Sequence, residues 1–433
     1  MAKDIQGVGL GIASRFAGSE FAKKYGLRRP AEKLAYASTK KGFEVIGQMM
    51  AKKSDKKGDE VMMLPEPSTA GMFDLTLSEE QQMIKDTVRA YAEDVVRGLA
   101  HDANEAMDLP ETYLQDIMEL GLNFFSVPES LGGAAQSYSP TTSAIIAEEL
   151  AWGDFSLAYA TLAPVAVANA IVKWGTDEQK EKYLPNYLKD NPFKAAIAVQ
   201  ESGALFDPAK LTAKAKKTKA GFRISGVKTM VPFGGSADMY LVAARYKRRN
   251  RLFLVPGDAP GVSFEAAPMM GLRACALGTL TLDKVPLTKD ALLGDDSFNF
   301  ETFMDLGQLH WCSLALGACQ AALDYLIPYV NEREAFGEPI SHRQAVAFMV
   351  ADIGIELEAM RLMVWRAAAL AEAGKPFHRE AYLAQLLVAE KAMKIGTDTV
   401  QLLGGHGFTK EHPAERWYRD LRVLACVNGG MHL

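Results

Sequence analysis

The sequence predicts an α+β chain in which helix-forming and strand-forming segments are segregated instead of alternating. Apolar residues recur at helical spacing from 77 to 188, and short β-rich runs separated by Gly, Pro and Asp turns follow between 193 and 298. Long apolar-periodic helices return from 301 onward. This order predicts a helical N-terminal part, a central antiparallel sheet or barrel, and C-terminal helices.

Composition narrows the class of protein. The 433 residues are 48% hydrophobic and 23% charged, as in soluble globular proteins with a large core. A net charge of −5 does not favour nucleic acid, which calls for a basic surface. No apolar run approaches the ~18 residues needed to span a bilayer. We therefore expect a soluble or peripheral protein.

Cysteines and histidines indicate neither a disulfide framework nor a metal site. The four cysteines lack CxxC spacing and lie in apolar stretches, so we expect buried free thiols in a reducing compartment. The seven histidines form no HExxH-like pair, so no metal is expected. The cysteines are Cys275, Cys312, Cys319 and Cys426.

Charge is concentrated at the N-terminus. Residues 1–60 have a balance of +6 and the rest of the chain −11. We interpret 1–70 as a basic extension and linker, which is either a solubilising or partner-docking arm or a contact with an anionic membrane surface. The expected location is a cytoplasm of bacterial type, with peripheral membrane contact through 1–60 as one possibility.

Local signals set the expected domain boundaries. Ser78 followed by Gln81 is a capping box that begins the helical domain, expected over 71–192. A β-domain is expected over 193–300, with strands near 194–200, 222–227, 239–244, 251–255 and 278–282. A helical domain over 301–433 includes a long helix near 345–373. No GxGxxG or GxxxxGK[ST] segment supports a Rossmann or P-loop fold.

Six short segments occur in the order and at the spacing that are typical of one protein family. They read Pro-Glu-Ser-Leu-Gly-Gly at 128–133, Glu-Glu-Leu-Ala at 148–151, Gly-Thr-Asp-Glu-Gln-Lys at 175–180, Glu-Arg-Glu-Ala-Phe-Gly at 332–337, Gln-Leu-Leu-Gly-Gly-His-Gly-Phe at 401–408 and Tyr-Arg-Asp at 418–420. Over about 75–420 the chain therefore resembles the acyl-CoA dehydrogenase family. The resemblance implies a C-terminal four-helix bundle and oxidoreductase chemistry on CH–CH donors of acyl-CoA.

The resemblance also implies FAD, held between the β-domain and the bundle and partly by a neighbouring subunit. Arginine gives charge-assisted bonds to phosphate, and glycines allow close backbone approach. A plainer interpretation is that the arginine forms a surface ion pair and the glycines only turn the chain. The residues implied for FAD are Arg333, Phe336, Gln344, Gln401, Gly404 and Gly405.

The family's catalytic glutamate is missing from both positions where the resemblance places it. The position after Tyr-Arg-Asp is Asn428, and an amide cannot act as a base near neutral pH. The alternative position, on the first helix of the bundle, is Gly307, followed by Gln308.

Segments that would face the flavin also depart from the family pattern. Phe206 replaces a small serine near CoA, Met230 replaces the tryptophan that covers the flavin ring, and Pro232 replaces a threonine near flavin N5. Proline offers neither hydroxyl nor N–H. The substitutions predict weak FAD binding.

Other residues of the sequence are candidates for the catalytic base. His310 is one turn beyond Gly307 and could share its helix face, although a satisfied histidine beside Trp311 is the plainer interpretation. Asp305 and His432 are further candidates. Glu201 is expected to anchor its own loop.

Three functions remain open from the sequence. The chain is a catalytically degenerate homologue acting as a structural or partner subunit of a heteromeric acyl-CoA dehydrogenase-type complex. Alternatively, it is an active FAD-dependent dehydrogenase with a relocated base, or an acyl-CoA flavoprotein whose chemistry needs no α-proton base. Self-association or association with an active subunit is expected.

Overall fold

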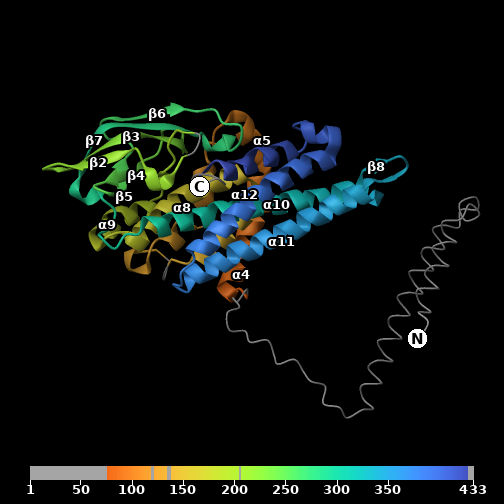
Figure 1. The fold of residues 1–433 in the computed structure, drawn as a ribbon, viewed down its shortest axis with the longest axis horizontal. Helices are drawn as coiled ribbons and strands as arrows, with labels where there is room; N and C mark the ends of the chain where they lie inside the picture. The colour runs from red at the N-terminus through yellow and green to blue at the C-terminus, as the bar shows by residue number, and fades with distance from the viewer. Residues whose placement is uncertain (1–75, 119–120, 134–137, 204–205, 428–433) are drawn as a thin grey trace, which may run out of the picture. The chain divides into compact units, whose positions relative to one another are not determined.

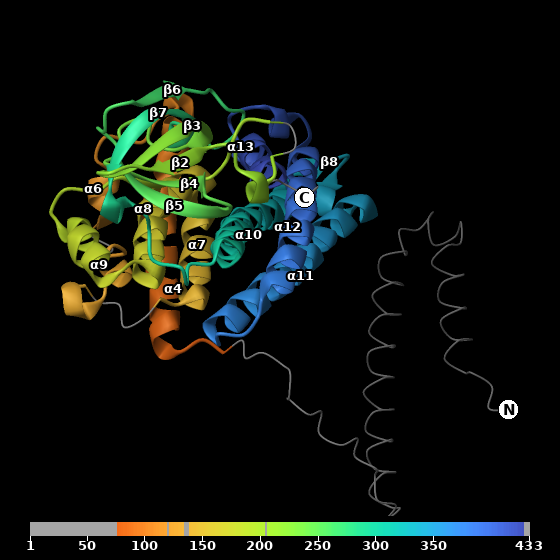
Figure 2. The same ribbon diagram turned by 60° about the vertical axis from the view of Figure 1, so that its left-hand side comes forward.

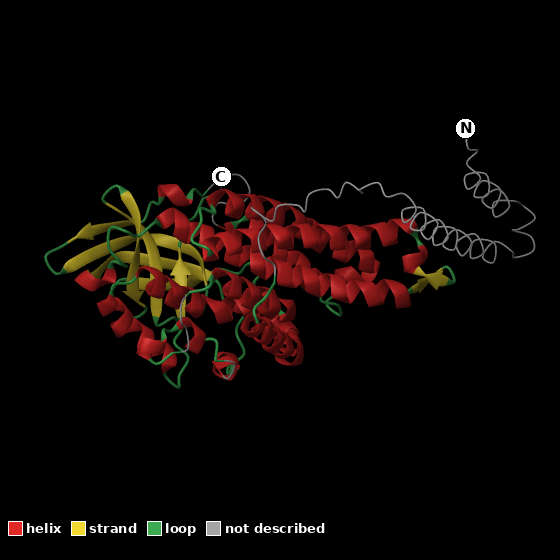
Figure 3. Cartoon of the chain, turned by 90° about the horizontal axis from the view of Figure 1, so that it is seen from below, coloured by secondary structure: helices red, strands yellow, loops and turns green. Residues whose placement is uncertain are grey.

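The computed structural model describes residues 76–118, 121–133, 138–203 and 206–427. Over this part of the chain, helices, a sheet and helices follow one another as predicted, so the fold class is confirmed (Figures 1 and 3). The predicted extension at 1–70, together with Asn428 and His432, lies outside the described residues.

The N-terminal helices begin at the predicted capping box. Ser78 Oγ accepts from the backbone N–H of Gln81, and Gln81 Oε1 accepts from that of Ser78, both at 3.1 Å. These bonds satisfy N–H groups that a helix start leaves without partners. The elements of this domain are α4 (Glu79–Tyr91), the π-helix η1 (Ala92–Val96), α5 (Arg97–Ala106), α6 (Tyr113–Met118), the 3₁₀ turns η2 (Phe124–Ser126) and η3 (Glu129–Leu131), α7 (Pro140–Gly153), α8 (Phe155–Trp174), α9 (Asp177–Tyr183) and the 3₁₀ turn η4 (Leu184–Leu188).

Helix α8 corrects one expectation from the sequence. The helix has 20 residues, and its most apolar 18-residue window has a mean hydropathy of 1.7, so it is long and apolar enough to cross a bilayer by length and composition alone. However, 67% of its apolar window is buried inside the protein. A buried helix can be apolar on every side, so α8 is explained as a core helix.

The middle of the chain forms one seven-stranded sheet in the order β1-β4-β2-β3-β7-β6, with β5 paired to β4. Most pairs are antiparallel as predicted, whereas β1 and β2 each join β4 in parallel. Sequence patterns missed β2 and β6 because both expose most of their side chains and so lack an apolar run. The strands are β1 (Ala195–Ala198), β2 (Lys214–Lys217), β3 (Gly221–Val231), β4 (Met239–Tyr246), β5 (Arg249–Pro256), β6 (Val262–Ala266) and β7 (Gly278–Thr288).

The C-terminal helices pack beside α7. Figure 2 shows α7 and α8 beneath the sheet, with α10, α11 and α12 alongside them. Contrary to the expectation of four buried thiols, Cys426 is exposed, whereas the other three are buried. The elements are α10 (Phe300–Glu332), the small hairpin β8 (Glu334–Ala335) and β9 (Glu338–Pro339), α11 (Gln344–Glu372), α12 (His378–Leu403) and α13 (Ala414–Leu421).

Helices α7 and α10 approach so closely at Gly317 that a side chain does not fit. A Cβ there would lie 2.0 Å from the carbonyl oxygen of Glu148, whereas a Cβ at Gly354 on α11 would meet no atom closer than 3.9 Å. We expect Gly317→Ala to lower the free energy of unfolding by roughly 1–3 kcal/mol, because the helices must separate. Gly354→Ala should leave it unchanged or raise it by up to ~1 kcal/mol.

Urea unfolding of both variants followed by circular dichroism measures the difference. Equal effects of the two substitutions would contradict the close packing of α7 on α10.

Candidate functional site

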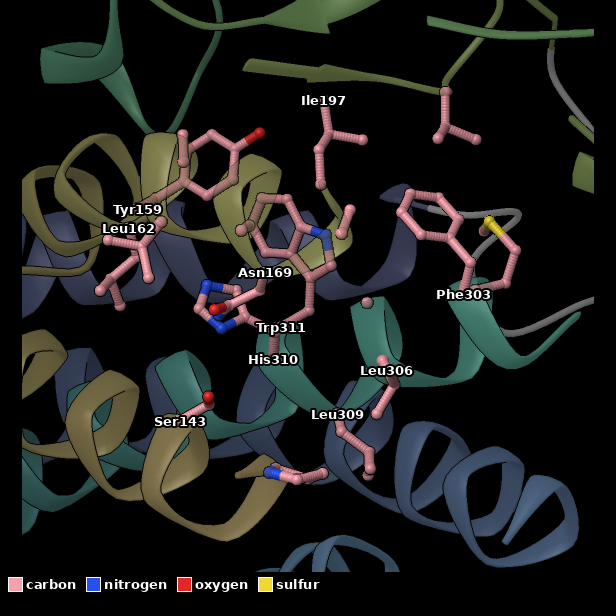
Figure 4. Close-up of a pocket in the computed structure, with 18 of the residues that line it drawn as sticks. Ser143, Tyr159, Leu162, Asn169, Ile197, Phe303, Leu306, Leu309, His310 and Trp311 are labelled. Atoms are coloured by element: carbon pink, nitrogen blue, oxygen red, sulfur yellow. The ribbon is translucent and has the colours of Figure 1, made fainter. Parts of the chain in front are cut away.

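A cavity of about 170 Å³ lies between α7, α8 and α10 and is bordered by β1 and β3 (Figure 4). Its walls are mostly apolar. The lining residues named in the figure are Ser143, Tyr159, Leu162, Asn169, Ile197, Phe303, Leu306, Leu309, His310 and Trp311.

Helical spacing places these side chains on facing stripes. On α8 the lining positions include 159, 162, 166 and 169, and on α10 they include 303, 307 and 310. Residues three or four apart lie on one face of a helix, so each helix presents a single face to the cavity. Tyr159 of α8 and Trp311 of α10 stack across the wall with ring centroids 4.5 Å apart.

No carboxylate lines the cavity within the described part of the chain. Gly307 is part of the wall, so the first of the two implied base positions does face the cavity but has no side chain. Val427, the residue directly before Asn428, also lines it. For Asn428 itself no placement is described.

His310 faces the cavity from α10 one turn beyond Gly307. Its imidazole has no hydrogen-bond partner among the residues described. Burial lowers the pKa of His310 to about 4, so the ring is neutral at pH 7. A neutral imidazole with so low a pKa is a weak base.

The other candidate bases in the described chain do not line the cavity. Asp305 is buried and bonds to His378 Nδ1 of α12 at 2.9 Å, and burial raises its pKa. Glu201 accepts from the buried Lys228 ammonium at 2.8 Å and from the backbone N–H groups of Thr212 and Ala213. Its carboxylate therefore ties the segment after β1 to β3 and to the start of β2.

The region where a flavin ring would lie offers few hydrogen-bond donors. Met230 lines the cavity in a left-handed conformation (φ 58°), and Pro232 has no N–H. The next two N–H groups, of Phe233 and Gly234, already donate to the carbonyls of Cys275 and Ala276 at 3.0 and 2.9 Å. The region that would hold the flavin ring therefore fits FAD poorly.

The residues implied for the other end of FAD are brought together and exposed. Tyr329 of α10 donates to the Leu403 carbonyl at 3.3 Å, which joins the end of α10 to the end of α12. Phe336 is 97% exposed, and nothing lies within 4 Å of a Cβ built on Gly404 or Gly405. Gln344 and Gln401 are exposed as well.

Arg333 is exposed beside them and forms no ion pair within the described chain. A free guanidinium next to open glycine backbone suits a phosphate group. These residues fit the adenosine and pyrophosphate end of FAD.

Helix α10 separates the cavity from the exposed residues around Arg333. It is continuous over 33 residues and begins beside the cavity. At ~1.5 Å per residue, Gly307 and Arg333 are roughly 39 Å apart along the helix.

Sequence analysis missed the α8 side of the cavity. The lining residues Tyr159 and Asn169 belong to a segment that is apolar on nearly every side, so no periodic polar face drew attention to them. The sequence signal that could have indicated this wall is the presence of these two polar residues, ten positions apart, in an otherwise apolar helix.

Models of one family match most of the chain. The acyl-CoA dehydrogenase N-terminal domain matches residues 78–191, its middle domain 196–285 and its C-terminal domain 299–431.

Individual proteins show the same likeness. The chain is 33% identical over 368 residues to the mitochondrial short-chain specific acyl-CoA dehydrogenase of Bos taurus, covering 82% of this chain and 87% of that protein. It is 32% identical over 367 residues to the human enzyme of the same name, with the same coverage. The solved structure of butyryl-CoA dehydrogenase from Megasphaera elsdenii superposes with a TM-score of 0.76 at 26% identity, covering 83% of this chain and 96% of that one.

Proposed function

Because the chain belongs to the acyl-CoA dehydrogenase family, we propose that it binds an acyl-CoA without desaturating it and serves as the partner subunit of a heteromeric acyl-CoA dehydrogenase-type complex. The observation that carries this proposal is the cavity wall, in which no described residue is a carboxylate. Gly307 stands at one implied base position and Asn428 at the other.

The chemistry of desaturation explains why this absence matters. The α-proton of an acyl thioester is weakly acidic, so its removal near pH 7 needs a placed base of suitable pKa. The pKa of His310, lowered by burial to about 4, makes its imidazole a poor acceptor for that proton. The apolar wall can still bind an acyl chain and exclude water from it.

FAD binding in this proposal is divided between chains. FAD supplies the hydride acceptor in this family when it is bound. Here Arg333, Phe336 and the Gly404–Gly405 turn would hold the adenosine end of a cofactor whose ring lies in another chain. This assignment follows from the ~39 Å between Gly307 and Arg333.

The outer face of α11 supports association. Phe348, Ile355 and Leu362 are exposed and spaced by seven residues, so they form one apolar stripe along the helix. Exposed apolar stripes on long helices are typical of protein–protein interfaces. We propose that this stripe packs against a second chain, either a copy or an active homologue.

A second candidate function is supported by His310. Its imidazole faces the cavity one turn from Gly307, so an active enzyme with a relocated base would use this side chain. The low pKa weighs against it.

The proposed function predicts that the chain alone has no dehydrogenase activity. The purified chain supplied with FAD should show no acyl-CoA-dependent flavin bleaching in anaerobic mixing with straight-chain and branched acyl-CoAs. General-base help is worth roughly 10²–10⁴-fold, so Gly307→Glu should raise a near-zero rate to a measurable trace, whereas the control Gly354→Glu on exposed α11 should not. Rapid bleaching by the unmodified chain, abolished in His310→Ala, would replace the first proposal with the second.

The next prediction concerns the cofactor. The isolated chain should lose FAD on dialysis, because the ring end offers few donors. Loss of a charge-assisted phosphate contact in Arg333→Ala should weaken the Kd for added FAD by roughly ten- to hundred-fold, whereas Arg248→Ala, in the exposed β4–β5 turn, should not. Fluorescence titration measures both. Stoichiometric FAD retained through dialysis would contradict this expectation.

The prediction on assembly uses the α11 stripe. Ile355 is 67% exposed, so Ile355→Glu should leave the fold intact and reduce the mass measured by light scattering at micromolar concentration. The control Met83→Glu replaces a similarly exposed side chain on α4 and should not change the mass. A monomeric unmodified chain would show that the stripe is not a self-association surface.

A further inference from the structure

Several polar side chains face the cavity without a hydrogen-bond partner in the described chain, among them Tyr159 and Asn169 from α8 and His310 from α10 (Figure 4). The Thr229 hydroxyl and the Trp311 indole N–H are further examples, whereas two other polar groups of the wall are satisfied. Ser143 Oγ donates to the Ser139 carbonyl at 2.9 Å, and Gln200 Nε2 donates to the Cys426 carbonyl at 3.3 Å. An unpartnered polar group in an apolar cavity is unfavourable unless a ligand or water supplies the missing bond.

The side chains of Tyr159, Asn169 and His310 are all neutral. Burial lowers the pKa of His310 to about 4 and raises the pKa of Tyr159 above its ordinary value, and the Asn169 amide does not titrate. Neutral donors and acceptors match a hydroxyl or a carbonyl better than a carboxylate, which calls for a cation.

The cation of the described wall, Lys173, lies far from the end of the cavity where Tyr159 and His310 are. Lys173 is exposed and lies against the rings of Tyr138 and Trp174. It is one turn from Asn169 but 14 residues along α8 from Tyr159, or roughly 21 Å at ~1.5 Å per residue, so a carboxylate beside His310 would lack a cation.

The position of His310 on α10 indicates where a polar group of the ligand would bind. His310 directly precedes Trp311, whose ring stacks on that of Tyr159 in the cavity wall. Gly307 lies one turn earlier on the same face of α10, about 4.5 Å along the helix axis. A thioester beside Gly307 would therefore bring a carbon only a few bonds along its acyl chain next to the imidazole.

We propose that the cavity selects an acyl-CoA whose short acyl chain carries a neutral hydrogen-bonding group, a hydroxyl or a carbonyl, and that His310 is the specificity-determining residue. The inference rests on the proposed function in one respect, namely that the cavity accepts an acyl-CoA. It adds the chemical class of the acyl group.

Isothermal titration of the full chain at pH 7 tests this selection. The probes are butanoyl-CoA and its 3-hydroxy, 4-hydroxy and 3-oxo derivatives, which share one chain length. At least one oxygenated derivative should bind about ten-fold more tightly than butanoyl-CoA, which is the effect of about one neutral hydrogen bond in a buried site.

Variants locate the effect. His310→Leu should abolish the preference while retaining butanoyl-CoA binding, and His310→Gln, which keeps a neutral hydrogen-bonding side chain, should retain much of it. Leu314→Met, one turn beyond His310 on α10 and outside the cavity wall, is the control for altered packing of this helix and should retain the preference in full. Circular dichroism and thermal melting confirm that each variant is folded.

The outcomes separate this inference from the proposed function. Equal affinity of the unmodified chain for all four thioesters overturns the selection but leaves acyl-CoA binding intact. A preference that survives His310→Leu overturns the role of His310. Failure to bind any of them overturns the proposed acyl-CoA binding and the selection together.

Discussion

Helix α10 runs without interruption from the cavity to the far end of the helical bundle, and its length constrains what one chain can do. Residues 303–311 of this helix supply part of the cavity wall, and its last residues lead into the exposed segment that includes Arg333 and Phe336. Because a helix is rigid on this scale, the separation of roughly 39 Å is fixed. A cofactor that needs both sets of contacts must draw them from two chains. In the proposed function, cofactor binding and association with a second chain therefore go together.

The close packing that holds α10 in place depends on small side chains. Gly317 lets α10 lie against the backbone of α7, and the buried Glu148 of α7 bonds to Arg361 of α11 at 2.7 Å. Buried carboxylates need such partners, because an unpaired buried charge is strongly destabilising. The α7 wall of the cavity is thus held in place by contacts of α7 with α10 and α11.

Sequence patterns predicted the elements better than they predicted the cavity. The capping box at Ser78 and the helix near 345–373 are local signals, and α11 lies within one residue of the expected bounds. Gly307 and His310 could be placed on one face because both belong to α10. Tyr159 and Asn169 could not be placed opposite them from the sequence, because which faces of α8 and α10 lie against each other depends on tertiary packing. β2 and β6 were missed for a related reason: pairing in the sheet, and not an apolar run, holds them.

The cavity indicates that the protein binds a ligand. A space of about 170 Å³ leaves the apolar side chains around it without the packing contacts that a filled core would give them. Larger side chains at Gly307 or Ala163 would fill that space, so packing alone gives no reason for it. A chain that only docked to a partner through its surface would be more stable without it. A cavity with neutral polar groups and no carboxylate in its described wall therefore favours a protein that binds its ligand without removing a proton from it.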